Sequence, residues 1–281
     1  MEVQIMPSDF KPSHSGLHFP NKFPASLIHL RVCGIPIPVG NTKYGMCGGM
    51  VYASADYYKA GLSIPSEQES PSDTKHPQLF NYLKQRQVES ITASDLSNYF
   101  SLMFTNKNQD ADVTHSAWQT LQVALDRKDV IPLGLIRAKH KPWDMVKHHQ
   151  VLAYDYKLDG EQVTLYVYDP RFPNDDEVTL KFTANKPEEI LFEKDPLGMV
   201  YCLFCTQYIP NERPPLVNKT ARTHQASIPN QHTMLLQPTL HYGSLFKPEP
   251  NREKAPSIEN ISESFGHEYS HSPEKTEICS L

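Results

Sequence analysis

The hydrophobic and polar positions of this chain follow a helical period in its first half. Apolar residues recur at helical spacing and predict helices at about residues 44–58, 78–89, 93–104 and 113–127. In the first helix, turn-forming residues precede Cys47, so Cys47 lies in the first helical turn. Gly61 is placed to end that helix.

From Ile131 onward the period changes to that of β-strands. Alternating and β-branched residues predict successive strands at residues 131–136, 149–154, 163–168, 177–180 and 199–204. Asp159-Gly160 is a strong hairpin signal between the second and third of these strands. One more strand is predicted earlier, at residues 27–32. Helices followed by antiparallel strands predict an α+β domain.

Proline content and apolar periodicity divide the chain into three parts. We expect an extended N-terminal arm over residues 1–15, packed on the domain surface, and one folded domain over residues 16–210. Residues 211–281 have little apolar periodicity, many prolines and nearly balanced charge. Such a segment buries too little apolar surface to form a core, so we predict a disordered tail.

Charge and composition narrow the classes of function. The formal net charge is −5 and basic residues form no stripe, which argues against nucleic acid as a partner. No apolar run approaches the roughly 20 residues needed to span a bilayer, and no signal-peptide pattern opens the chain. The 5 cysteines are an odd number, which argues against a disulfide framework. We expect a protein that is cytoplasmic as synthesised.

Cys47 is the first candidate for chemistry. The start of a helix carries unpaired backbone N–H groups and the positive end of the helix dipole, and both favour a thiolate. A helix N-terminus and a neighbouring imidazolium lower the pKa of a cysteine to roughly 3.5–7.5. The poor helix formers Gly48 and Gly49 indicate that another group approaches this turn closely. The alternative for Cys47 is a packed, inert thiol.

His149 and Asp169 are the candidate partners of that thiol. His149 begins one predicted strand, and Asp169 ends the strand that pairs with it through Asp159-Gly160. The start of one antiparallel strand lies beside the end of the next, so an imidazole and a carboxylate meet at one edge of the sheet. His148 is an alternative to His149, although only one of the two can face the helix. Asp169 with the following proline is also compatible with an ordinary turn.

Taken together, these motifs resemble the papain-like cysteine peptidases, and most closely the bacteriocin-processing peptidase type. That type carries Cys-Gly, His-x-Val-(Val/Leu) and Asp-Pro, which stand here as Cys47-Gly48, His149-Gln150-Val151-Leu152 and Asp169-Pro170. The resemblance implies a papain-like α+β fold, in which the nucleophile at a helix N-terminus packs on an antiparallel sheet. It also implies a catalytic triad of Cys47, His149 and Asp169.

The same resemblance suggests the rest of the site. The family places a glutamine six residues before the cysteine as an oxyanion donor, and Asn41 stands at that position here. Thr42 or the backbone N–H of Cys47 are alternative donors. The resemblance implies a protein or peptide substrate, and neither a metal nor a cofactor.

A thioester on Cys47 leaves the outcome of the reaction open. Release by water would make the protein a protease or amidase, and release by an amine would make it a transglutaminase or acyltransferase. An inactive peptidase fold used for binding is the third alternative.

Three further features have simple and functional interpretations. Cys202 and Cys205 have the spacing of a redox or zinc motif but lie in a strand-like apolar run, so we interpret them as core residues. The loop containing Trp143 precedes His149 and is interpreted as a gate or as a solvated loop. The Glu/Ser-bearing tail resembles the C-terminal signals of bacterial effectors that are exported by type IV secretion. If the tail is such a signal, the protein is exported without a cleavable signal peptide and its target is a host protein. The alternative is a solvated tail.

Overall fold

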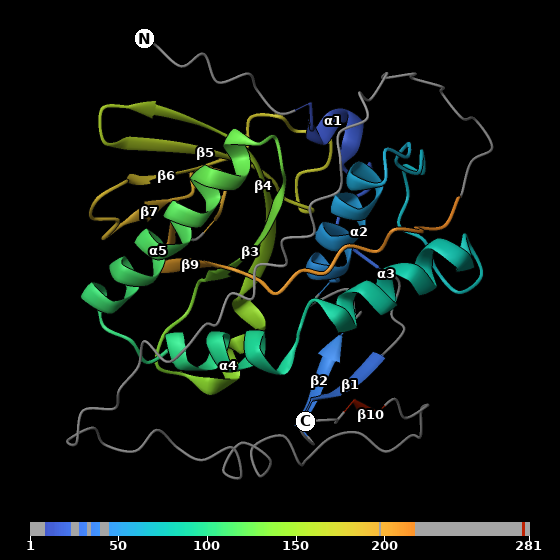
Figure 1. Cartoon of the computed structure of the whole chain (residues 1–281). Coiled ribbons are helices and arrows are strands. Elements are labelled where there is room, and N and C mark those ends of the chain that lie inside the picture. The colour runs from blue at the N-terminus through green and yellow to red at the C-terminus, as the bar shows by residue number, and fades with distance from the viewer. Residues whose placement is uncertain are drawn as a thin grey trace, which may run out of the picture. The chain divides into compact units, whose positions relative to one another are not determined.

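The computed structural model describes residues 9–23, 28–32, 35–39, 45–196, 198–216 and 277–278. The chain divides into two units, and all described residues belong to the unit formed by residues 1–220 and 272–281. In this unit, helices come first along the chain and an antiparallel sheet follows (Figure 1). The predicted α+β class is confirmed.

The four predicted helices are present. They are α2 (Cys47–Lys59), α3 (Pro77–Glu89), α4 (Ala93–Leu102) and α5 (Lys107–Asp126). The short helix α1 (Pro12–Ser15) and the 3₁₀-helix η1 (Pro142–Lys147) were not predicted. Helix α5 begins earlier than the predicted start near residue 113, because Asn106 and Gln109 form a capping box there. Gly61 terminates α2 as predicted, two residues after the last helical residue, Lys59. The N–H groups of Gly61 and Leu62 donate to the oxygens of Tyr58 and Tyr57, which is a Schellman motif.

The main sheet has seven strands in the order β8-β7-β6-β5-β4-β3-β9, and every neighbouring pair is antiparallel. The strands are β3 (Ile131–Ile136), β4 (His149–Asp159), β5 (Gln162–Tyr168), β6 (Thr179–Thr183), β7 (Ile190–Leu191), β8 (Met199–Val200) and β9 (Cys202–Cys205). Gly160 has a φ of 59° and opens the two-residue turn between β4 and β5, as predicted.

The prediction of one strand over residues 199–204 is wrong. Tyr201 separates β8 from β9, and these two strands form opposite edges of the sheet. Residues 199–200 pair with β7, whereas the N–H of Tyr201 donates to the oxygen of Ile136 at the end of β3, at 2.8 Å. The partner strand therefore changes from β7 to β3 at Tyr201. One residue spans less than about 4 Å, so the two edges lie close together and the sheet curls toward a barrel.

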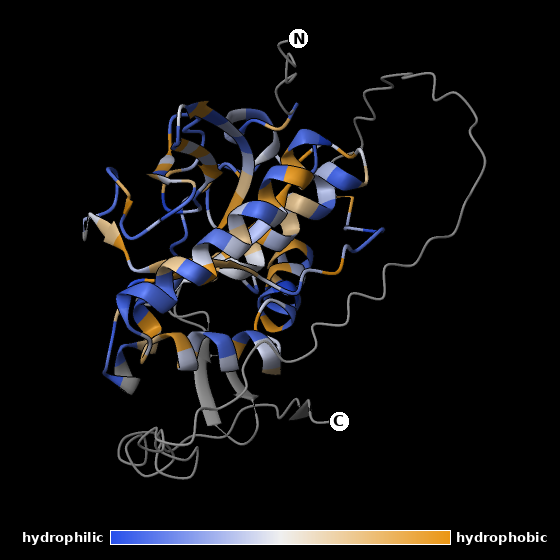
Figure 2. Ribbon diagram, turned by 60° about the vertical axis from the view of Figure 1, so that its left-hand side comes forward, coloured by the Kyte–Doolittle hydropathy of each residue, from blue (hydrophilic) through white to orange (hydrophobic). Residues whose placement is uncertain are grey.

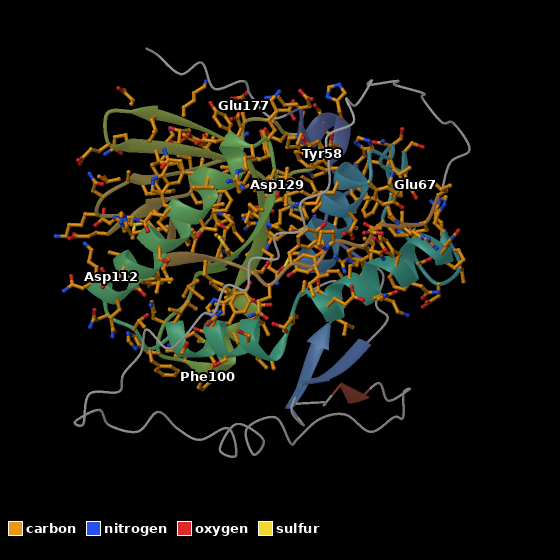
Figure 3. The ribbon with its side chains drawn as sticks, viewed as in Figure 1. Tyr58, Glu67, Phe100, Asp112, Asp129 and Glu177 are labelled. Atoms are coloured by element: carbon orange, nitrogen blue, oxygen red, sulfur yellow. The ribbon has the colours of Figure 1, made fainter. Side chains whose placement is uncertain are left out.

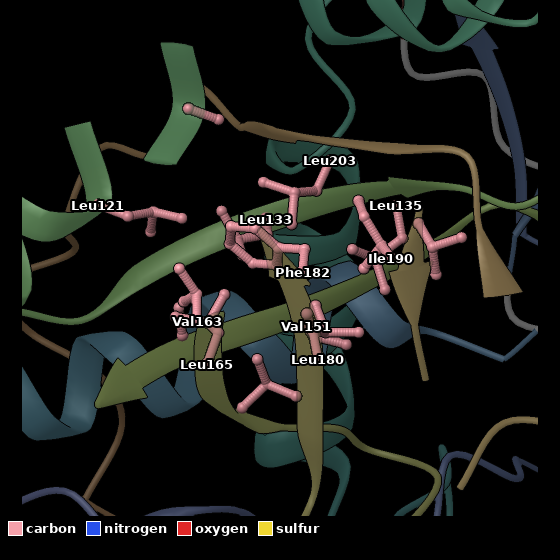
Figure 4. Close-up of a cluster of buried hydrophobic side chains, with 14 of the residues drawn as sticks. Leu121, Leu133, Leu135, Val151, Val163, Leu165, Leu180, Phe182, Ile190 and Leu203 are labelled. Atoms are coloured by element: carbon pink, nitrogen blue, oxygen red, sulfur yellow. The ribbon is translucent and has the colours of Figure 1, made fainter. Parts of the chain in front are cut away.

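Helix α5 covers one face of the sheet. Its apolar residues Trp118, Leu121 and Leu125 pack with the inward side chains of the strands in one buried cluster. Helix α5 and all seven strands of the sheet contribute to this cluster. Figure 4 shows its centre, with Leu121, Leu133, Val151, Leu165, Leu180 and Leu203 among the labelled residues. Along the helices, hydrophilic and hydrophobic residues alternate (Figure 2), as expected where one side of a helix faces a core.

Helix α2 packs on the other face of the sheet. Val51, Tyr52 and Ala55 of this helix form a cluster with Leu152 and Tyr154 of β4. A bulge at Tyr154 shifts the pairing of β4 with β5, so residues 151, 153 and 156 face α5 whereas 152 and 154 face α2. At its C-terminal end, α2 is tied to the turn before β3. There the Tyr58 hydroxyl donates to the oxygen of Lys128 and Lys59 pairs with Asp129 (Figure 3).

Gly48 and Gly49 allow α3 to approach the first turn of α2. A Cβ at Gly49 would lie 2.3 Å from the oxygen of Leu83, and one at Gly48 would lie 2.0 Å from Oγ of Ser90. The Gly49 N–H also donates to Oε1 of Gln87 at 2.9 Å. The close approach predicted for these glycines is therefore made by α3 of the same chain.

Both ends of the predicted domain continue beyond the predicted boundaries. In the region expected to be an extended arm, residues 12–15 form α1, and Phe10 is fully buried between α2 and the sheet. Past the predicted boundary at residue 210, the N–H of Asn211 donates to Asp56 and the oxygen of Pro215 accepts from Tyr57. Most of the predicted tail, residues 217–276 and 279–281, lies outside the described residues.

A second, three-stranded sheet is formed by β1 (Ile28–Val32), β2 (Ile35–Val39) and β10 (Glu277–Ile278), in the order β10-β1-β2. Strand β1 was predicted, whereas β2 was not, because its two prolines disfavour a strand. Among the helices of the described chain, none combines the length and the apolar character that crossing a membrane requires.

Candidate active site

Cys47 is the first residue of α2. Met46, which caps the helix, supplies no side-chain cap, and of the first-turn N–H groups that of Gly49 donates to Oε1 of Gln87. The thiol is half-buried. The position of Cys47 therefore matches the prediction of a thiol in the positive field of a helix N-terminus.

His149 and Asp169 meet at one end of the β4–β5 pair. Nε2 of His149 lies 2.8 Å from Oδ1 of Asp169, and the two residues are 5% and 0% exposed. The imidazole also interacts with the thiol of Cys47, and each of the two groups shifts the pKa of the other. Because Nε2 is used by Asp169, Nδ1 is the ring nitrogen left for the thiol. The structure thus brings together the three side chains that the sequence singled out.

The electrostatics of these three groups favour an ion pair. Burial alone would raise the pKa of Cys47, but the hydrogen bond and charge of His149 and the N–H of Gln150 outweigh it, so the pKa lies below that of a free thiol. Burial would lower the pKa of His149, whereas Asp169 and Cys47 raise it above its usual value. Despite burial, His149 and Arg171 hold the pKa of Asp169 well below its usual range. Thiolate and imidazolium therefore stabilise each other.

Gln150 supports the thiol from the next position on β4. Its backbone N–H contributes to the lowered pKa of Cys47, and its Nε2 donates to the oxygen of Ser90 at 2.9 Å. Tyr99 of α4 lies over the same strand and donates its hydroxyl to the oxygen of His149 at 3.5 Å. The strand end that carries His149 is thus held by α3 and α4.

His148, the alternative base, occupies a different environment. Its Nδ1 accepts the N–H of Arg137 at 3.2 Å, and its ring stacks on Tyr99 with centroids 5.4 Å apart. Burial, with Arg137 and Lys139, lowers its pKa to about 4. A histidine that is neutral at physiological pH and whose Nδ1 is already bonded is a poor partner for a thiolate, so His149 has the better geometry.

An unpredicted buried network holds Asp169. Arg171 donates to both carboxylate oxygens of Asp169, with Nη2 2.6 Å from Oδ2, and its Nη1 lies 2.7 Å from Oδ2 of Asp195. Arg137 donates to Oδ1 of the same Asp195 at 2.7 Å. Both aspartate side chains are 0% exposed, so each needs these charged donors.

The sequence offered one weak signal for this network. Arg171 stands two residues after Asp169, within reach of a turn. Asp195 is 24 residues further along, in the turn after β7, and no local pattern connects it with Arg171. Such a partner is visible only in the folded chain.

The sequence also singled out the oxyanion residue Asn41, the cysteine pair Cys202 and Cys205, and the loop before His149. The predicted oxyanion residue Asn41 and its alternative Thr42 lie outside the described residues. Cys202 is fully buried, and Cys205 packs against the α5 cluster, where burial raises its pKa to about 12. The loop before His149 contains η1, whose last residue is Lys147.

This arrangement has the parts that nucleophilic catalysis requires: a nucleophile with a lowered pKa, a base beside it and a carboxylate that orients the base. Within the described residues, no group of three or more His, Cys, Asp or Glu side chains is arranged to hold a metal ion. Comparisons with family models, curated protein sequences and solved structures found no match for this chain.

Proposed function

We propose that this protein is a papain-like cysteine hydrolase that cleaves an amide or isopeptide bond of a protein or peptide. The observation that carries the proposal is the chain of contacts from the Cys47 thiol to His149 and from His149 to Asp169, 2.8 Å away. The position of the thiol at the first residue of α2, against an antiparallel sheet, also supports it.

The first half of the proposed reaction forms a thioester. The thiolate of Cys47 attacks the carbonyl carbon of the substrate, and the electron pair of the C=O bond moves to oxygen. When the tetrahedral intermediate collapses, the C–N bond breaks and the leaving nitrogen takes the proton from Nδ1 of His149. Asp169 keeps the ring oriented and stabilises its charge before that transfer. The products are a free amine and an acyl group on Cys47.

The second half releases the acyl group. Water attacks the thioester carbonyl while the now neutral His149 accepts a proton from it. The C–S bond breaks, the carboxylic acid leaves, and the thiolate–imidazolium pair is restored. The backbone N–H of Cys47, at the start of α2, is a donor available to the developing oxyanion.

A peptide-library experiment tests the proposal. The full-length protein is incubated with a mixed peptide library and with dansylcadaverine, and new peptide termini and dansylated peptides are quantified by mass spectrometry. New termini that disappear in Cys47→Ala and His149→Ala support a hydrolase. Dansylated peptides without new termini would instead show a transglutaminase. Neither product, together with an unreactive Cys47, would overturn the proposal in favour of a binding protein.

A further inference from the structure

The N-terminal segment of the domain runs along the loop that follows Asp169. Ser13 donates through its N–H and Oγ to Asp176, at 2.9 and 2.7 Å. His18 hydrogen-bonds Asn174 at 2.5 Å. The N–H of Asn21 donates to the oxygen of Pro170 at 2.9 Å. As the segment advances, its partners move back toward Asp169, so the two stretches are antiparallel.

Asn21 is where this segment reaches the catalytic residues. Its backbone contacts Pro170, the residue after Asp169, and its side-chain Oδ1 accepts the N–H of Met46, the residue before Cys47, at 2.6 Å. One half-buried residue therefore hydrogen-bonds both the chain that carries the nucleophile and the chain that carries the acid.

The loop before Cys47 is shaped around the Asn21 amide. Gly45 has a φ of 64°, a conformation that L side chains rarely adopt. A Cβ at this position would also lie 2.4 Å from Nδ2 and 2.5 Å from Oδ1 of Asn21. The turn into α2 thus requires glycine at position 45 partly because the amide of Asn21 approaches so closely.

We propose that Asn21 is a positioning residue that fixes the sulfur of Cys47 relative to His149 and Asp169. The inference rests on the proposed function, because it assigns a role in that same site. Cys47 begins α2, whereas His149 begins β4 and Asp169 directly follows β5. Asn21 is bonded to the residue before Cys47 and to the residue after Asp169, so it restrains the separation on which the thiolate–imidazolium pair depends.

Two substitutions separate positioning from general stability. Asn21→Leu removes the acceptor of the Met46 N–H, and we expect the maximal alkylation rate of Cys47 by iodoacetamide to fall about tenfold or more. Asn21→Asp keeps an acceptor of the same shape, so the maximal rate should be retained. The added negative charge lies near the thiolate, however, and should raise the apparent pKa of Cys47.

The control is Ser13→Ala, which removes a hydrogen bond to Asp176 at the far end of the same segment. It should leave both the maximal rate and the apparent pKa unchanged. Alkylation of full-length protein is followed across pH by mass spectrometry of the Cys47 peptide, and the melting temperature of each variant is measured in parallel.

The outcomes separate the inference from the proposed function. Loss of rate in Asn21→Leu, with rescue and a raised pKa in Asn21→Asp, supports positioning. If Asn21→Leu reacts like the wild type, or if Ser13→Ala loses rate in the same way, the inference about Asn21 is wrong. The proposed function still stands in that case, provided that Cys47 of the wild-type protein has a low pKa. A wild-type Cys47 of ordinary thiol pKa overturns both.

Discussion

Oδ1 of Asp169 lies 2.8 Å from Nε2 of His149, although 20 residues separate them in the chain. The pairing of β4 with β5, in which Leu152 is opposite Tyr168, places the start of one strand beside the end of the other. The carboxylate is fully buried and fixed by Arg171, so it holds the imidazole in one orientation. The ring is thereby available to Cys47 through its other nitrogen.

The first prediction concerns the pH dependence of Cys47. The pKa of Cys47 is lowered and that of His149 is raised, in part because each group stabilises the charged form of the other. Alkylation of Cys47 should therefore proceed readily at neutral pH. In His149→Ala the lowering by the imidazole is lost, whereas burial and the charge of Asp169 still raise the pKa of the thiol and only the Gln150 N–H still lowers it, so the pKa of Cys47 should rise.

The measurement is the iodoacetamide alkylation rate of each cysteine as a function of pH. A thiol with a pKa near 9 is only about 1% ionised at pH 7, so His149→Ala should react far more slowly there. His148→Ala is the matched control, because His148 does not contact the thiol, and its profile should follow the wild type. An unchanged pH profile of Cys47 alkylation in His149→Ala would show that His149 does not lower the pKa of Cys47.

The second prediction concerns the buried network around Asp169. Arg171→Met leaves Asp169 and Asp195 without a shared donor, and the protein should lose about 3–5 kcal/mol of unfolding free energy. Arg171→Lys keeps the charge but not the fork geometry, so its loss should be smaller yet measurable. Arg213→Met, at an exposed position, is the control. Urea denaturation compares the variants; equal stability of wild type and Arg171→Met would argue that the network contributes little.

The third prediction concerns the close contact of α2 with α3. Alanine normally stabilises a helix relative to glycine by about 1 kcal/mol. At Gly49, however, a Cβ would lie 2.3 Å from the Leu83 oxygen, a backbone atom that cannot rotate away. Gly49→Ala should therefore lower the unfolding free energy by about 1–3 kcal/mol. A stabilised variant in thermal or urea denaturation would show that the helices separate at no cost.

The fourth prediction concerns the chain after β9. Asp56 of α2 is fully buried and forms an ion pair with Arg86. Its carboxylate also accepts hydrogen bonds from the hydroxyl groups of Tyr82 at 2.7 Å and Tyr208 at 2.8 Å. Because a hydrogen bond to a charged group is worth about 1.5–3 kcal/mol, Tyr208→Phe should lose that much unfolding free energy.

The control for this substitution is Tyr201→Phe, since Tyr201 is 46% exposed. Urea denaturation should show no loss for this variant. If Tyr208→Phe were equally neutral, the hydrogen bond from Tyr208 to the buried carboxylate of Asp56 would contribute little to stability.

Sequence patterns were sufficient for the features that depend on local spacing. The helix at residues 78–89, the turn at Gly160 and the meeting of His149 with Asp169 all follow from periodicity and from antiparallel pairing. The helix requires only its local apolar spacing, and the other two features require only that neighbouring strands pair.

The features that were missed depend on contacts between distant segments. Tyr201 interrupts an apolar run because its N–H is bonded to Ile136 across the closing sheet. Asp195 and Asn21 approach the site from other parts of the chain. A close approach to Gly48 and Gly49 was predicted, but not that α3 makes it. None of these relationships leaves a mark in local hydrophobic spacing.

The most direct test of the central claim is to trap the acyl-enzyme. Full-length protein is treated with p-nitrophenyl acetate at neutral pH, quenched in acid and mapped by mass spectrometry. The account predicts acetylation of Cys47, absent in a folded Cys47→Ala variant and strongly reduced in His149→Ala, with the buried Cys202 unmodified. Acetylation of Cys47 no faster than that of a thiol in the urea-unfolded chain would contradict it.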